Sequence, residues 1–143
     1  MREILFRGKK YDGKWYFGSY LYLNVPPRDW KGDARGKAEP VHYIVNEKDI
    51  NYAVMPETVC QFTGKMDMNG KKVFENDILQ LYTVWADGTR EKFAKVIVKW
   101  WDNDQCYVLT TKEGHHCDDF GNYGRPEYFE VIGNIYDNAD LMA

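Results

Sequence analysis

The stretch FAKVIVKWWDNDQCYVLTT, residues 93–111, decides the fold class of this chain. Val96, Val98 and Trp100 occupy every second position in it, and an extended strand places every second side chain on the same face. One face of such a strand is therefore wholly apolar. The pattern predicts a β-strand over residues 93–101 with this face turned to a core.

A hairpin follows if residues 102–105 form a four-residue loop. Trp100 then lies opposite Tyr107, and Val98 lies opposite Leu109. Cross-strand pairs of aromatic or aliphatic side chains stabilise a sheet. We therefore predict both pairs on the core side of an antiparallel hairpin.

Trp101 must point to the opposite face from Trp100, because consecutive strand residues alternate. Either another element covers Trp101 or it is a contact residue. Exposed aromatic side chains and sheet edges are the usual material of protein interfaces. We predict a candidate interface that includes Trp101, Trp30 and Lys99.

Similar runs rich in Val, Ile, Tyr, Phe and Trp recur along the chain, as in a β meander. Asp12-Gly13, Asn69-Gly70 and Asp87-Gly88 lie between several of them, and such dipeptides favour two-residue hairpin turns because both members tolerate positive φ. No segment carries a helical stripe. The expected strands cover residues 2–7, 14–24, 41–45, 58–63, 71–74, 77–84, 93–101, 105–111 and 128–136.

Two stretches break the β pattern. Residues 24–40 (NVPPRDWKGDARGKAEP) and 112–127 (KEGHHCDDFGNYGRPE) are rich in Gly, Pro and charged residues and are predicted to be long surface loops. The only helix expected is a short turn at residues 138–142, with Asn138 as its cap.

Composition sets further limits. The chain has 143 residues, of which 44% are hydrophobic and 29% charged, as in a folded domain. Its net charge of −3 gives no overall field that would attract nucleic acid or an anionic membrane. No apolar run is long enough to span a membrane and the start lacks a signal peptide, so we expect a cytoplasmic protein with no membrane partner. The three cysteines form no CxxC pair and are expected to be reduced.

The segment VCQFTGKMDMNGKKVFENDIL, residues 59–79, resembles the central block of the YopX family, which occurs in phages and prophages. Residues 1–7 (MREILFR) and 129–138 (FEVIGNIYDN) resemble the beginning and the end of that family. Three motifs in the same order are a specific signal. One departure is Asn76, which stands where the family usually has Gly, and Asn is the next most tolerant residue for positive φ.

The resemblance implies an architecture and brings no catalytic residues with it. It implies a mainly β protein with an SH3-like small barrel in the carboxy-terminal part, residues 57–143. An amino-terminal β segment, residues 1–56, is expected to pack on this barrel. The family implies a phage or prophage accessory protein, and we expect it not to be an enzyme.

The acidic residues of the central block have a structural interpretation. Asp67 can accept hydrogen bonds from backbone amides of the turn at residues 67–70, and Asp77 can do the same at the next corner. We predict that Asp67, Glu75 and Asp77 stabilise turns, with a ligand or metal role as the alternative.

One cluster has the side chains of a metal site: His115, His116, Cys117, Asp118, Asp119 and, nearby in the sequence, Cys106. Structural zinc sites usually take paired ligands from two turns, whereas adjacent residues of an extended segment point apart. A solvated loop is predicted instead, with no metal and no cofactor. The neighbouring carboxylates also disfavour a Cys117 thiolate nucleophile, and no phosphate-binding loop is present.

Basic residues crowd the amino terminus beside aromatic ones. Arg7, Lys9, Lys10 and Lys14 lie close to the sequence Trp15-Tyr16-Phe17, as in barrels that stack bases along a basic groove. Alternatively, the aromatic rings pack the sheet and the lysines coat its edge. The function predicted is a non-enzymatic protein-interaction module that binds itself, as a homo-oligomer, or a host or phage protein. A nucleic-acid-binding accessory protein that uses a small β-barrel is the alternative.

Overall fold

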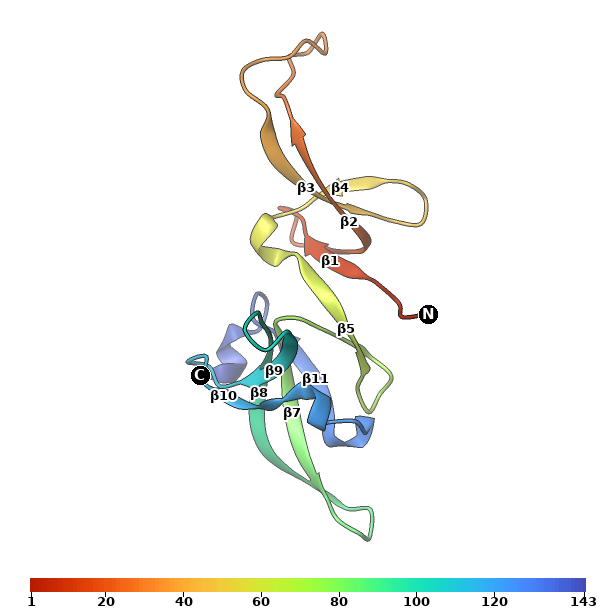
Figure 1. Ribbon diagram of the computed structural model, residues 1–143, viewed down its shortest axis with the longest axis vertical. Helices are drawn as coiled ribbons and strands as arrows, with labels where there is room; N and C mark the ends of the chain where they lie inside the picture. Colours follow the sequence, from red (N-terminus) through yellow and green to blue (C-terminus); the bar gives the residue numbers. More distant parts are fainter. The chain divides into compact units, whose positions relative to one another are not determined.

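The computed structural model describes residues 1–143 and is mainly β, which confirms the predicted fold class (Figure 1). It divides into two compact units, residues 3–61 and residues 62–143 together with Met1 and Arg2. The boundary expected from the sequence lies between residues 56 and 57. None of the helical segments has the length and apolar character needed to cross a bilayer.

The amino-terminal unit is an antiparallel sheet in the order β4-β3-β2-β1-β5. Its interior holds Ile44, Val54 and Cys60. Gly8 is required beneath them, because a Cβ at this position would lie 2.7 Å from Cγ2 of Val54. The elements are β1 (Phe6–Lys9), β2 (Trp15–Val25), β3 (Glu39–Val45), β4 (Asn51–Ala53), the short 3-10 helix η1 (Pro56–Thr58) and the first residues of β5 (Cys60–Met66).

In the second unit the later residues of β5 pair with β6, and a five-stranded antiparallel sheet has the order β10-β9-β8-β7-β11. The elements are β6 (Lys72–Phe74), β7 (Asp77–Val84), β8 (Arg90–Trp101), β9 (Cys106–Thr110), β10 (His116–Asp119), β11 (Phe129–Asn134) and the 3-10 helices η2 (Phe120–Asn122), η3 (Pro126–Tyr128) and η4 (Ala139–Met142). The core contains Val73, Leu79, Leu81, Val96, Val98, Leu109, Phe120, Phe129 and Val131. The five-stranded ladder ends at β10 and β11, and no pairing closes it.

The β8–β9 hairpin has the predicted register. Residues 102–105 connect the strands, Val98 pairs with Leu109, and Trp100 pairs with Tyr107. Val98 and Leu109 are fully buried, but Trp100 is 39% exposed. The prediction that the Trp100–Tyr107 pair lies inside the core was therefore wrong in part, because this pair sits at the open end of the hairpin, where its rings meet edge to face at 5.0 Å.

Six connections share one loop geometry, although the sequence suggested two-residue turns at three of them. In each, the backbone N–H of the first residue donates a hydrogen bond to the carbonyl of the fifth residue. The N–H of the fourth residue donates one to the carbonyl of the first. Only the fourth residue has positive φ, as in a type I turn followed by a bulge. The expected dipeptides thus lie at corners, with a longer loop than predicted. The corners span residues 10–14, 29–33, 46–50, 67–71, 85–89 and 111–115.

The remaining differences lie in short or polar segments. β4 and β10 are three and four residues long, and neither was expected as a strand. Residues 112–127, predicted to be a surface loop, contain β10, and Phe120 after it is buried in the core. The predicted turn at residues 138–142 is present as η4, but the Asn138 side chain does not cap it and instead accepts a hydrogen bond from the backbone of Asn134 (3.2 Å).

Candidate interaction surface

The hairpin of β2 and β3 extends beyond its neighbours in the amino-terminal unit (Figure 1). β1 pairs with β2 only at residues 15–18, and β4 pairs with β3 only at residues 43–45. One further backbone hydrogen bond, from Val54 to His42 (3.0 Å), joins the hairpin at this level. Beyond it, β2 and β3 pair only with each other. We call residues 19–42 the β arm; β4 still borders the β3 partners of residues 19–21.

The β arm exposes apolar side chains on both of its faces. Leu21 and Leu23 lie on one face and are 37% and 44% exposed, and Tyr22 lies on the other and is 53% exposed. An isolated two-stranded ribbon is marginally stable in water. Contiguous exposed apolar surface is characteristic of sites where a protein contacts a partner. The β arm therefore has the composition of an interaction element.

Aromatic contacts fix the base of the arm. The Tyr20 and His42 rings stack at 5.8 Å, and the Tyr20 hydroxyl is hydrogen-bonded to Nδ1 of His42. Phe6 of β1 also packs against Tyr20, with 5.5 Å between ring centroids. Burial raises the pKa of the Tyr20 hydroxyl, with a smaller effect from Tyr22. These contacts hold the base of the arm against the rest of the sheet.

The loop at the end of the arm, residues 26–38, presents Trp30 to solvent. The Trp30 side chain is 89% exposed, and its own neighbour Lys31 places its ammonium 5.1 Å from the ring centroid. Asp29 orders this loop by accepting hydrogen bonds from the backbone N–H groups of Lys31 and Asp33 (both 2.9 Å) and from the guanidinium of Arg35 (3.0 Å). The hydrogen bond from Asp33 is the main cause that lowers the pKa of Asp29. A structured corner therefore holds an exposed indole.

The basic residues of the amino terminus lie against their own aromatic neighbours. The guanidinium of Arg7 lies 4.7 Å from the Trp15 ring, and Lys9 lies 5.9 Å from the same ring. Lys10 faces Tyr16 at 5.6 Å. Arg7 is buried, whereas Lys14 is exposed on the β1–β2 corner. The structure thus brings Arg7 and Lys9 together and leaves Lys14 apart from them.

Trp101 and Lys99 belong to the second unit, on the face of β8 opposite to Val98. Another element covers Trp101: its ring lies 5.0 Å from the ring of His116 on β10, and Trp101 is half-buried. Lys99 is also half-buried and donates a hydrogen bond to Asn76 Oδ1 (2.6 Å). Of the three predicted interface residues, Trp30 is the most exposed.

The histidine and cysteine cluster is drawn into local contacts. His116 pairs with Asp119 (Nε2 to Oδ1, 2.8 Å), and Asp118 accepts a hydrogen bond from the Asn122 side chain (2.6 Å). Cys106 is half-buried, and burial, followed by the charges of Asp119 and Asp104, raises the pKa of its thiol. No three His, Cys, Asp or Glu side chains of the structure are placed so that they could hold a metal ion.

Comparison with known families shows one match that covers nearly the whole chain. A family model described as YopX protein matches residues 5–143. The chain belongs to the YopX family. The resemblance seen in the three sequence motifs is confirmed, and no curated protein matches the sequence.

In this YopX chain the central motif builds corners, as predicted for two of its acidic residues. The buried carboxylate of Asp67 accepts hydrogen bonds from the backbone of Asn69 and Lys71 (both 2.9 Å). The buried Asp77 accepts one from the backbone of Phe74 (2.8 Å). The corner role of half-buried Glu75 stays a prediction.

Asn76, the departure from the usual YopX glycine, does adopt positive φ (66°). Its side chain bridges two partners: the amide Nδ2 donates to the Tyr136 hydroxyl (2.8 Å), and Oδ1 accepts from Lys99 (2.6 Å). A glycine at this corner could make neither contact. This chain therefore has a polar link there that a glycine would lack.

Sequence reasoning found Trp30 but missed the apolar residues of the two strands of the β arm. Leu21, Tyr22 and Leu23 were assigned to a strand, but not to an interface. A signal was present, because four consecutive residues of β2, YLYL at residues 20–23, are aromatic or aliphatic. A strand with one solvated face would alternate between apolar and polar residues.

Proposed function

We propose that this YopX-family chain is a non-enzymatic accessory protein of phages or prophages that acts by binding another protein through the β arm. The first partner we propose is a second copy of the same chain. The observation that carries the proposal is the two-stranded arm, with Leu21, Tyr22 and Leu23 exposed along it and Trp30 at its end.

The arm offers two ways to gain free energy on association. Beyond β1, the edge of β2 at residues 19–25 has no strand beside it, and it could pair with the same edge of a second arm across a two-fold axis. The apolar side chains on the faces of the arm would lose exposed surface at the same time, at about 25 cal/mol for each Å² buried. In a two-fold symmetric pairing, each copy contributes both its strand edge and its apolar faces.

Sedimentation velocity over a range of concentrations tests this proposal. The wild type should associate, and a double variant Leu21→Ser, Leu23→Ser should sediment as a monomer. Phe93→Ser is the matched control, since Phe93 is an exposed apolar strand residue outside the arm (56% exposed) and its variant should associate like the wild type. A wild type that stays monomeric at every concentration would remove self-association. In that case, failure of a photo-reactive group at position 30 to cross-link any host or phage protein would remove the interaction function itself.

Two finer features belong to the same proposal. We place the protein in the cytoplasm, and we assign the second unit to the SH3-like class of small barrels. Support for the barrel comes from the β5–β6 corner, which reaches β11: Met68 donates a backbone hydrogen bond to Phe129 O (3.2 Å). This contact brings a hairpin next to the strand at one end of the five-stranded sheet.

Nucleic-acid binding is the second candidate, and one observation favours it. Tyr16 and Tyr52 stack at 4.0 Å beneath the ammonium of Lys10, and the exposed Lys14 and Tyr11 belong to the same β1–β2 corner. Aromatic and basic groups of this kind can bind single strands by stacking and by phosphate contacts. Binding of a fluorescent oligonucleotide at two salt concentrations tests it, because phosphate contacts must weaken steeply with salt. Absence of binding at low salt would end this alternative.

A further inference from the structure

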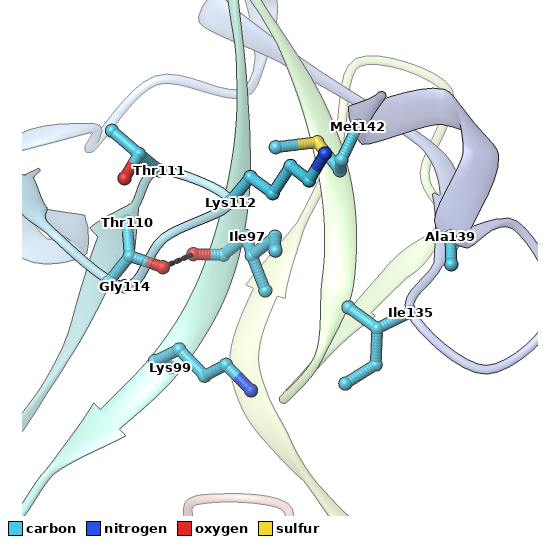
Figure 2. A pocket seen from close by; sticks show the side chains of 9 residues that line it. All are labelled: Ile97, Lys99, Thr110, Thr111, Lys112, Gly114, Ile135, Ala139 and Met142. Atoms are coloured by element: carbon cyan, nitrogen blue, oxygen red, sulfur yellow. Dashed lines mark hydrogen bonds between the residues drawn. The ribbon is translucent and has the colours of Figure 1, made fainter.

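A cavity of about 290 Å³ opens on the second unit, on the face of the sheet that is turned away from the hydrophobic core (Figure 2). Ile97 and Lys99 of β8 contribute to it, and both alternate with the core residues Val96 and Val98. The corner after β9 forms a second wall, and Ile135 and the η4 helix form a third. The proposed interaction through the β arm makes no use of this cavity.

The lining combines an apolar floor with two positive charges. Ile97 is buried, and Figure 2 shows its side chain between the side chains of Lys99 and Lys112. Ile135 and Met142 add apolar surface from the carboxy-terminal segment. No Asp or Glu lines the cavity. Its charge is therefore complementary to an anion.

A hydrogen bond to a neighbouring corner holds the Lys99 side chain in place. Its ammonium donates one hydrogen bond to Asn76 Oδ1 (2.6 Å), and the same Asn76 side chain donates to the Tyr136 hydroxyl (2.8 Å). An ammonium group has three donors, so two remain for a ligand. A charge fixed by a neighbouring hydrogen-bond chain binds with a smaller entropic cost than a mobile one.

Lys112 is exposed and forms no hydrogen bond or ion pair within the chain. The nearest carboxylate in the sequence, Glu113, is engaged elsewhere. It accepts hydrogen bonds from its own backbone N–H and from the Thr111 hydroxyl, and these two contacts are the main causes that lower its pKa. The charge of Lys112 is a smaller cause of the same shift, and no hydrogen bond holds the Lys112 ammonium away from the cavity.

From this arrangement we infer that the cavity binds a small carboxylate with a short apolar chain. The chain lies on Ile97, Ile135 and Met142, and the carboxylate is attracted by the positive charge that Lys99 and Lys112 give to the lining. The volume is at the lower end of the roughly 300–1,000 Å³ of small-molecule sites, which suits a ligand smaller than a nucleotide or a drug.

Titration of the full-length, isotope-labelled chain with sodium octanoate, followed by amide NMR, tests this inference. Octanoate should shift the amide signals of Thr111, Gly114 and Ala139 in a saturable manner. The matched probe 1-octanol has the chain without the charge and should bind about tenfold more weakly or worse. Acetate, which has the charge without the chain, should show no saturation. Equal affinity for octanol and octanoate, or octanoate shifts confined to other surfaces, would overturn the inference.

Substitutions test separately what the two charges and the apolar floor contribute to binding. Lys112→Met and Lys99→Met should each weaken octanoate binding by about fivefold or more and leave octanol binding unchanged. Lys92→Met is the control, since Lys92 is an exposed lysine of the same strand that does not line the cavity. Ala139→Phe should fill the cavity and abolish binding. Because Ala139 is exposed, this variant should keep the fold, and its thermal unfolding curve checks this. Octanoate binding unchanged by both Lys112→Met and Ala139→Phe would contradict the site.

Discussion

Asp67 accepts a hydrogen bond from the backbone N–H of Val131, 64 residues further along the chain, at 2.9 Å. This bond uses Oδ2, while Oδ1 accepts the two amides of the β5–β6 corner. One buried carboxylate therefore shapes a corner and fixes β11 to it. Of the residues in the YopX central motif, Asp67 connects the most distant parts of the second unit.

Replacing Asp67 should be among the most destabilising single changes at a polar site. Asp67→Ala leaves the buried Val131 amide without an acceptor, and we expect a loss of about 3 kcal/mol in the free energy of unfolding, measured in urea. Asp67→Asn retains an acceptor oxygen and should cost less. Asp87→Ala, at the exposed β7–β8 corner, is the control and should have a much smaller effect, because Asp87 is exposed and its partners, such as Thr89, lie within the same corner. Equal losses for Asp67→Ala and Asp87→Ala would contradict the role of the Val131 bond.

Asn76 combines backbone and side-chain requirements, and two variants separate them. Asn76→Gly removes the hydrogen bonds to Tyr136 and Lys99 but suits the positive φ of 66°. Asn76→Ala removes the same bonds and adds left-handed strain, so it should be less stable than Asn76→Gly by about 1 kcal/mol in chemical unfolding. Equal stability of the two variants would show that backbone conformation contributes nothing here.

Phe120 tests whether residues 112–127 belong to the core. Its ring is buried and packs edge to face on Phe129, with 5.2 Å between centroids. Phe120→Ala should lower the free energy of unfolding by about 3–5 kcal/mol, as expected when a buried aromatic ring is removed. Phe93→Ala is the control, because Phe93 is mostly exposed on β8, and it should change stability little. A small effect of Phe120→Ala would return this segment to the surface loop predicted from sequence.

The loop around Trp30 should lose order in acid. Hydrogen bonds lower the pKa of Asp29 below its ordinary value of 3.8, so the charged form stabilises the loop above that pH. This stabilisation is lost as the pH falls through the lowered pKa. The amide resonances of Lys31 and Asp33, followed from about pH 6 downward, should therefore move with a midpoint below 3.8. The Asp29→Asn variant should lose the transition, and a midpoint at or above 3.8 would contradict the hydrogen-bonded geometry.

The sequence predicted the strands that carry strong alternation and failed where local pattern was weak. The β8–β9 register was predictable because Val98 and Leu109 belong to alternating patterns on either side of a short loop. β10 was missed because its residues, His116 to Asp119, are polar, and their pairing with β9 is set by tertiary context. The corner roles of Asp67 and Asp77 followed from turn chemistry, but the bond to Val131 did not, since its partners are far apart in sequence.

The candidate sites were less predictable than the fold. Trp30 was recognised as an exposed aromatic residue, whereas the cavity was not foreseen, because Lys112 and Ile135 are brought together only when the carboxy-terminal segment returns to the sheet. The interface role of Lys99 stays a prediction, and its hydrogen bond to Asn76 was not foreseen. A charge pattern along the chain does not indicate which face of a sheet receives the next segment.

The shared geometry of the six corners makes them interchangeable parts. Each spans five residues and returns the chain with the same offset, so a corner such as residues 85–89 could be transplanted into residues 10–14 without shifting the pairing of the strands on either side. At corners whose side chains make only local contacts, such as residues 85–89, the loop sequence is thus free to diverge, or to receive an engineered tag, as long as the fourth residue accepts a left-handed backbone.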